Sequence, residues 1–158
     1  MRKVLALAAF LLLALPGAAR RADPLEERFK AADVLIEKGD YAGARDELLT
    51  ARTEFKDDDE RFILYHERTG ASWLREGRVK EDRRAFTAAL LEAKRLGVAD
   101  QSVARAYAGL GLCLRRENKD QLALRFFKKA LGERPDEGTW MFVEDQIREI
   151  EGAPPLPP

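Results

Sequence analysis

The sequence contains few of the residues that hold metals or form disulfides. Its 158 residues include a single cysteine, Cys113, and a single histidine, His66. One cysteine excludes an internal disulfide framework and a cysteine-based zinc cluster. One histidine excludes most of the metal and acid–base arrangements that need two imidazoles. We therefore expect no cofactor and no metal, and we expect that the protein is not an enzyme.

An excess of charge of one sign is also missing. Lys and Arg together number 28, as do Asp and Glu, so the formal net charge is zero. A chain with balanced charge has no general electrostatic attraction to nucleic acid, and we expect no nucleic-acid partner. The sequence has only 7 prolines and 11 glycines, and 46% of its residues are hydrophobic. That composition is typical of a folded, globular domain.

The N-terminal residues have the pattern of a secretory signal peptide. Two basic residues precede an unbroken apolar run at 4–15, and the small residues Gly17 and Ala19 follow at the spacing of a signal peptidase site. The run is too short to span a bilayer comfortably, although an uncleaved membrane anchor stays an alternative. We expect residues 1–19 to be removed after about Ala19. The protein would then be exported to the bacterial periplasm or the extracellular space, without a stable membrane span.

The rest of the chain has the apolar spacing of helices, and no useful segment alternates with a period of two. Asp23 and Asp40 can cap the first two helices, Gly77 ends the third, and Thr139 can cap the seventh. We expect an all-α domain at residues 20–151. It would contain hairpins at about 25–58, 60–97 and 101–137, a capping helix at 139–151, and a disordered, proline-rich tail at 152–158.

The fifth and sixth predicted helices carry a spaced set of small and large apolar residues. The order is aromatic, Leu-Gly, a further Leu, then Ala, aromatic, Ala and a final Pro. It is made by Tyr107, Leu110, Gly111, Leu114, Ala123, Phe127, Ala130 and Pro135. This order closely resembles the tetratricopeptide repeat. The resemblance extends over roughly residues 25–137 and implies antiparallel helix hairpins in an α-solenoid, with a C-terminal capping helix.

The two earlier hairpins match this pattern less well. Ala32 stands at the glycine position of the first hairpin. In the second hairpin, Gly70 is followed by a pattern of Phe86, Leu90 and Ala93, with Phe86 in place of the small residue. In this alignment, the last small residue of each hairpin is Ala51, Ala93 or Ala130. These three residues are 42 and 37 positions apart. The repeat period is about 34, so we place the excess in loops at 56–59 and 78–82.

The resemblance also implies a function. Proteins of this family usually bind a protein or peptide in a concave groove lined by the first helix of each hairpin. The groove-facing residues in this register are Phe29, Asp33, Ile36, Glu37, Leu64, Glu67, Ala71, Arg75, Arg105, Leu112, Arg115 and Arg116. The set changes from acidic to basic along the chain, which predicts a bipolar groove, unless these charges form only a solvated face.

We therefore expect a non-enzymatic adaptor or scaffold that binds a cell-envelope protein. The alternative is a self-assembling structural envelope protein, a homo-oligomer that stacks through the helix containing Trp140. Two polar motifs are interpreted as structural: His66 and Glu67 are helix neighbours that point in different directions, and the acidic run at 57–60 lacks the glycine of a calcium loop. Cys113 is expected to be a buried thiol.

Overall fold

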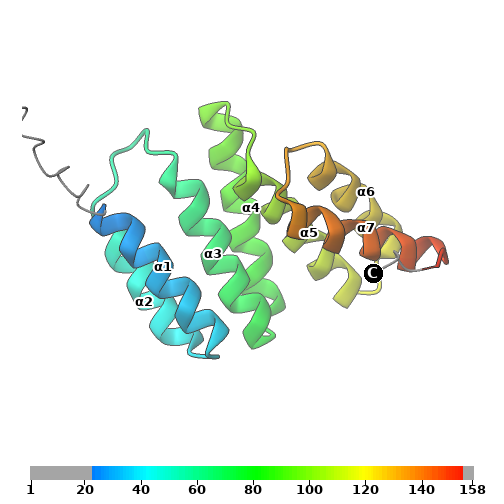
Figure 1. Ribbon diagram of the computed structural model, residues 1–158, viewed down its shortest axis with the longest axis horizontal. Helices are drawn as coiled ribbons and strands as arrows, with labels where there is room; N and C mark the ends of the chain where they lie inside the picture. Colours follow the sequence, from blue (N-terminus) through cyan, green and yellow to red (C-terminus); the bar gives the residue numbers. More distant parts are fainter. Residues whose placement is uncertain (1–22, 155–158) are drawn as a thin grey trace, which may run out of the picture.

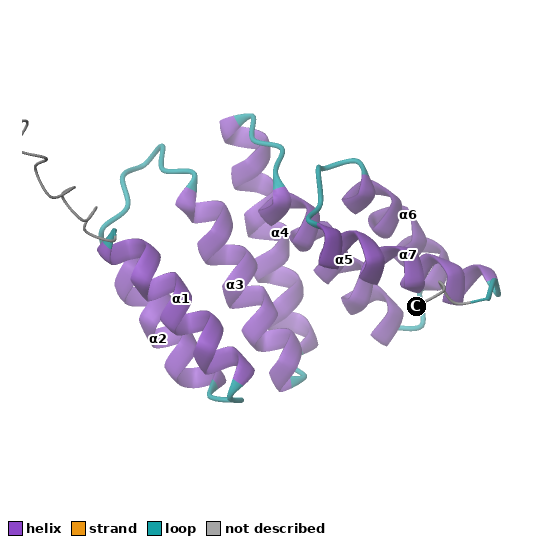
Figure 2. Cartoon of the chain, in the orientation of Figure 1, coloured by secondary structure: helices purple, strands orange, loops and turns teal. Residues whose placement is uncertain are grey.

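Residues 23–154 form seven α-helices in the computed structural model and contain no strand (Figures 1 and 2). The predicted signal peptide and residues 155–158 of the predicted tail lie outside this described range. None of the helices within residues 23–154 has the length and the apolar composition that crossing a membrane requires. The helices are α1 (Pro24–Glu37), α2 (Tyr41–Arg52), α3 (Arg61–Glu76), α4 (Val79–Leu96), α5 (Gln101–Arg116), α6 (Asp120–Leu131) and α7 (Glu137–Glu151).

The helices pack as three hairpins, α1–α2, α3–α4 and α5–α6, with α7 at the end (Figure 1). Every helix contacts the next one in the chain. The odd-numbered helices also contact one another, α1 with α3, α3 with α5, and α5 with α7, whereas no two even-numbered helices of the described chain are in contact. The odd-numbered helices therefore form the inner layer of a curved stack. This confirms the predicted all-α fold of helix hairpins.

Aspartate side chains start several of the helices. Asp23 and Asp40 accept hydrogen bonds from backbone N–H groups in the first turns of α1 and α2, as predicted. The start of the seventh helix was predicted wrongly. Asp136 is its cap and accepts a hydrogen bond of 2.8 Å from the backbone N–H of Thr139, so α7 begins at Glu137. A carboxylate in this position accepts a hydrogen bond from a backbone N–H group that has no partner within the helix. Its negative charge also interacts favourably with the positive end of the helix dipole.

Phe86 occupies the space between the backbones of α3 and α5. A Cβ atom at Gly70 would lie 2.7 Å from its ring Cε1 atom, and one at Gly109 would lie 2.4 Å from its Cζ atom. Both distances are too short for any other residue to replace these glycines without a shift. In the third hairpin, a Cβ at Gly111 would lie 2.5 Å from Cε1 of Phe127. The ring of Phe127 on α6 therefore packs directly against the backbone of α5 at Gly111.

These contacts correct the predicted register of the second hairpin. Gly70 and Phe86 meet as Gly111 and Phe127 do, and both pairs are separated by 16 residues. Phe86 therefore holds the large position, and Asp82 holds the small position four residues before it. In all three hairpins, the small position of the second helix follows the glycine position of the first helix by 12 residues. The pairs are Ala32 and Ala44, Gly70 and Asp82, and Gly111 and Ala123.

The corrected register also changes where the residues in excess of the repeat period lie. The turn at 56–59 is a loop, as predicted. The segment at 78–82 is not, because Gly77 reverses the chain in a left-handed conformation with φ +84° and α4 begins at Val79. The second excess lies in α4 itself, which has 18 residues, whereas α2 and α6 have 12 each.

Asp82 is a buried carboxylate where the other two hairpins have alanine. Its side chain is fully buried, and its Oδ1 atom lies 3.2 Å from the Sγ atom of Cys113, which donates to it. The Oδ2 atom has no hydrogen bond within the described residues, and the nearest cation, Nη1 of Arg116, is 4.0 Å away. Burial raises the pKa of the Asp82 carboxyl. It also raises the pKa of the thiol of Cys113, which is buried as predicted.

Substitution of Gly109 by alanine tests the contact with Phe86. We expect Gly109→Ala to lower the free energy of unfolding by about 1–3 kcal/mol, because the new Cβ forces the ring or the helices apart. Urea denaturation monitored by circular dichroism measures the change. The matched control is Gly138→Ala, also in a helix, where the nearest heavy atom to the new Cβ is 3.5 Å away. Equal stabilities of the two variants would contradict the close-packing argument.

Asp82→Ala places alanine at the small position of the second hairpin, where the other two hairpins already have alanine. We expect it to raise the free energy of unfolding by about 1–2 kcal/mol at pH 7, because a buried carboxylate with an unsatisfied oxygen is removed. Since the folded-state pKa of Asp82 is raised, the contribution of this group to stability falls as pH rises above the unfolded value of about 3.9, and the advantage of the variant grows. Urea titrations at pH 4 and pH 7 measure this. An advantage that shrinks toward pH 7 would refute the explanation.

Candidate functional site

A groove with a volume of about 790 Å³ lies on the inner layer of the stack. Its walls come from α1, α3, α5 and α7, and the ring of Phe86 reaches it from α4. Much of its lining is apolar, contributed by Ala71, Leu74, Ala108, Leu112 and Phe142. Of the residues predicted to face a groove, it brings together Glu37, Glu67, Ala71, Arg75, Arg105 and Leu112.

Three of the other predicted residues belong to the packing of the first hairpin. Phe29 is only 5% exposed and stacks on Phe55 with ring centroids 6.1 Å apart. Its predicted place in the groove is therefore wrong. Ile36 and Leu64 are half-buried against the same apolar cluster. The first helix has Arg28 where the repeat pattern has an aromatic residue, and the sequence therefore defines its register only weakly.

Arg115 and Arg116 hold helices together and do not line the groove. Arg115 donates to the side chain of Gln146 at 2.7 Å and to that of Glu149 at 2.6 Å, both on α7. Arg116 donates from Nη1 to the backbone carbonyl of Leu74 at 2.8 Å, which ties the end of α5 to the end of α3. Their predicted role in the groove is replaced by a structural one.

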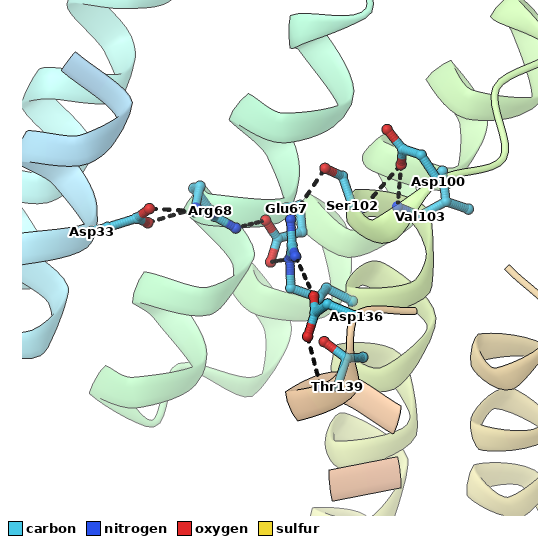
Figure 3. A network of polar contacts seen from close by, with 9 residues as sticks. Asp33, Glu67, Arg68, Asp100, Ser102, Val103, Asp136 and Thr139 are labelled. Atoms are coloured by element: carbon cyan, nitrogen blue, oxygen red, sulfur yellow. Dashed lines mark hydrogen bonds and ion pairs between the residues drawn. The ribbon is translucent and has the colours of Figure 1, made fainter. Parts of the chain in front are cut away.

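A ladder of alternating charges crosses the inner layer (Figure 3). On α1, Asp33 accepts a hydrogen bond of 3.2 Å from Arg68, which also pairs with its neighbour Glu67 on α3. The Oε1 atom of Glu67 lies 3.6 Å from Nε of Arg105 on α5. Arg105 in turn donates to Oδ2 of Asp136, the cap of α7, at 2.8 Å. Four helices are therefore joined by one chain of ion pairs, which we call the charge ladder.

Glu67 is the most deeply buried member of the ladder. It is 4% exposed, and this burial raises the pKa of its carboxyl, while the guanidinium groups of Arg68 and Arg105 oppose the rise. Its carboxylate is thus held between two cations. The predicted acidic-to-basic gradient is corrected here, because the acids and bases facing the groove alternate and neutralise one another.

Two charged residues of the groove lie outside the ladder. Glu37 and Arg75 are exposed, and neither forms an ion pair or a side-chain hydrogen bond with any residue of the described chain. They lie at the C-terminal ends of α1 and α3, where both helices reach the groove. Within residues 23–154, no three side chains of the metal-binding types come together as a candidate ion site. The groove thus offers an apolar surface with one free acid and one free base.

Sequence reasoning missed several groove residues, chiefly Arg68, Asp136 and Phe142. Phe142 is 39% exposed, and it follows Trp140 and Met141, which are 43% and 46% exposed. Three consecutive large apolar residues on a helix are 100° apart and cannot all face one core. That run was the available signal that α7 also has an exposed apolar surface.

Comparison of the chain with models of known protein families finds no match, and comparison with curated proteins finds none either. Function is therefore inferred from the residues of the groove and from the sequence pattern.

Replacement of Glu67 by glutamine tests the charge ladder. We expect Glu67→Gln to lower the free energy of unfolding by about 1–3 kcal/mol, because it leaves two partly buried arginines with less compensation. Glu37→Gln is the matched control, since Glu37 lines the same groove but is exposed and outside the ladder, and its effect should stay within about 0.5 kcal/mol. Urea denaturation at pH 7 measures both. A similar change in the two variants would mean that the ladder adds no stability.

Proposed function

We propose that this chain is a tetratricopeptide-type repeat protein that binds a segment of another protein in its inner groove. The observation that carries the proposal is the convergence of α1, α3, α5 and α7 on an apolar surface whose buried charges are already paired. The volume of about 790 Å³ is large enough for several side chains of a ligand. Such a surface favours recognition through apolar burial.

The groove residues indicate the chemistry of the bound segment. Leu74, Leu112 and Phe142 would cover apolar side chains, at about 25 cal/mol for each Å² removed from water. Because the ladder neutralises the central charges, the ligand needs no strong charge there. Glu37 and Arg75 would pair with a basic and an acidic residue at separate points of the segment, and so would fix its direction.

The N-terminal pattern indicates the cellular location in which this function would take place. Residues 1–19 have the basic start, apolar run and small-residue site of a signal peptide, which favours export to the periplasm or beyond. The protein would then be a non-enzymatic adaptor or scaffold in the cell envelope. Its partner would be an envelope protein with an exposed apolar segment.

A photo-crosslinking amino acid at Leu112 tests the groove directly in the native host. We expect this residue to capture one dominant partner protein, identified by mass spectrometry, because Leu112 lines the groove. The matched control carries the same amino acid at Leu49, which is 52% exposed on α2. Arg75→Glu should reduce the Leu112 adduct by about tenfold, which corresponds to about 1.4 kcal/mol. Equal capture from Leu49 and Leu112, unaffected by Arg75→Glu, would exclude the groove as the binding site.

A further inference from the structure

The terminal helix α7 has an outward face that combines exposed apolar side chains with unpaired acids. Trp140 and Met141 are 43% and 46% exposed. Glu137, Glu144 and Asp145 share this side of the helix, since spacings of three and four residues bring side chains together. None of these three carboxylates is in an ion pair or a side-chain hydrogen bond with another residue in the range 23–154. We call these five residues the outward face of α7.

A second helix has a face of the opposite charge. On α4, Lys80, Arg84, Thr87, Leu91 and Lys94 follow one another at spacings of four and three residues, and all are exposed. Leu91 has the highest exposure, 63%, of the large hydrophobic residues in the described chain. The three basic residues have no ion-pair partner there, unlike Arg83 and Arg95 beside them, which pair with Glu117 and Glu92. We call this set the outward face of α4.

The two faces are complementary but do not meet within one chain. Each has an apolar centre with charges around it, acidic on α7 and basic on α4. The helices α4 and α7 are not in contact, and Figure 1 shows α7 at the end of the stack and α4 in its middle. A symmetric contact of α7 with α7 would place acids against acids, and a contact of α4 with α4 would place bases against bases. Only a contact between different faces satisfies both charges.

We propose that the outward face of α7 docks on the outward face of α4 in a second copy of this chain. Trp140 would cover the exposed Leu91, and an aromatic anchor within a ring of paired charges is a common centre of protein interfaces. Each copy keeps one face of each kind, so the contact is head-to-side and extends copies into a ring or a filament. The contact does not use the groove, whose residues Arg75 and Phe142 stay free for another protein.

Charge reversal on each face tests this contact. The experiment uses the full chain, purified from its host after any processing that occurs there. Wild-type protein should show association in sedimentation velocity that increases with concentration and weakens between about 50 mM and 500 mM salt. Two reversed variants should each associate at least tenfold more weakly. The first carries Glu137→Lys, Glu144→Lys and Asp145→Lys, and the second carries Lys80→Glu, Arg84→Glu and Lys94→Glu.

An equimolar mixture of the two reversed variants is the decisive measurement. The basic α7 of the first then meets the acidic α4 of the second, so we expect the mixture to regain the mass of the wild type. Trp140→Ser should also weaken association, whereas Leu49→Ser, an exposed apolar residue on α2, should not. Circular dichroism shows whether each variant is folded, and Trp140→Ser keeps the test open if a triple variant does not fold.

Three results would overturn the proposal. These are a wild type that stays monomeric at low salt and about 500 µM protein, association that survives either reversal, and folded reversed variants whose mixture fails to associate. Arg75→Glu separates this contact from groove binding. It should leave sedimentation unchanged while it reduces partner capture, so failure of one proposal does not imply failure of the other.

Discussion

Phe86 lies where three helices meet, and the missing Cβ atoms of Gly70 and Gly109 allow its ring to pass between the backbones of α3 and α5. The ring is 1% exposed, so nearly all of its surface contributes to packing. This contact sets how closely the second and third hairpins approach. Because α3 and α5 are so near, Glu67 on one helix and Arg105 on the other come within 3.6 Å. Phe86 and Gly109 also line the groove. The packing of one ring therefore determines both the floor of the groove and the span of the charge ladder.

The charge ladder pairs charged side chains of the inner layer with one another, and its three carboxylates and two guanidinium groups leave a net charge of only −1. A carboxylate as buried as Glu67 carries a desolvation cost, which its two guanidinium neighbours offset. The links from Asp33 to Arg68 and from Arg105 to Asp136 continue the alternation to both ends of the inner layer. Rigid pairs of this kind are also ordered before a ligand arrives, so binding does not need to order them. The groove is thus suited to a ligand that contributes apolar surface and little charge.

Much of the fold was predictable from short-range signals. Asp23 and Asp40 start helices where capping rules place them, and Gly77 ends α3 with a positive φ. The register of the second hairpin was not predicted correctly, because the expected small position there is occupied by a buried aspartate. A search for a glycine and an aromatic residue 16 positions apart would have aligned Gly70 and Phe86 with Gly111 and Phe127.

The site was harder to predict than the fold, for a physical reason. Caps and turns depend on residues a few positions apart, whereas the ladder depends on side chains from four helices that meet only after packing. Glu67 and Arg105 were expected to face the groove, yet nothing in the sequence pairs them across 38 positions. Their pairing needs the α3–α5 distance that Phe86 sets, and the link to Asp136 needs the correct start of α7.

The groove and the outward faces of α4 and α7 are expected to respond differently to salt, because their charges are placed differently. The charges of the ladder are paired and partly buried, where mobile ions screen them little. The charges on the outward faces of α4 and α7 are unpaired and mostly exposed, where ions screen them strongly. An association between copies through these faces would therefore weaken at ionic strengths that leave an apolar groove contact intact. Under the two proposals, the same hairpin architecture would present two binding surfaces that respond differently to salt.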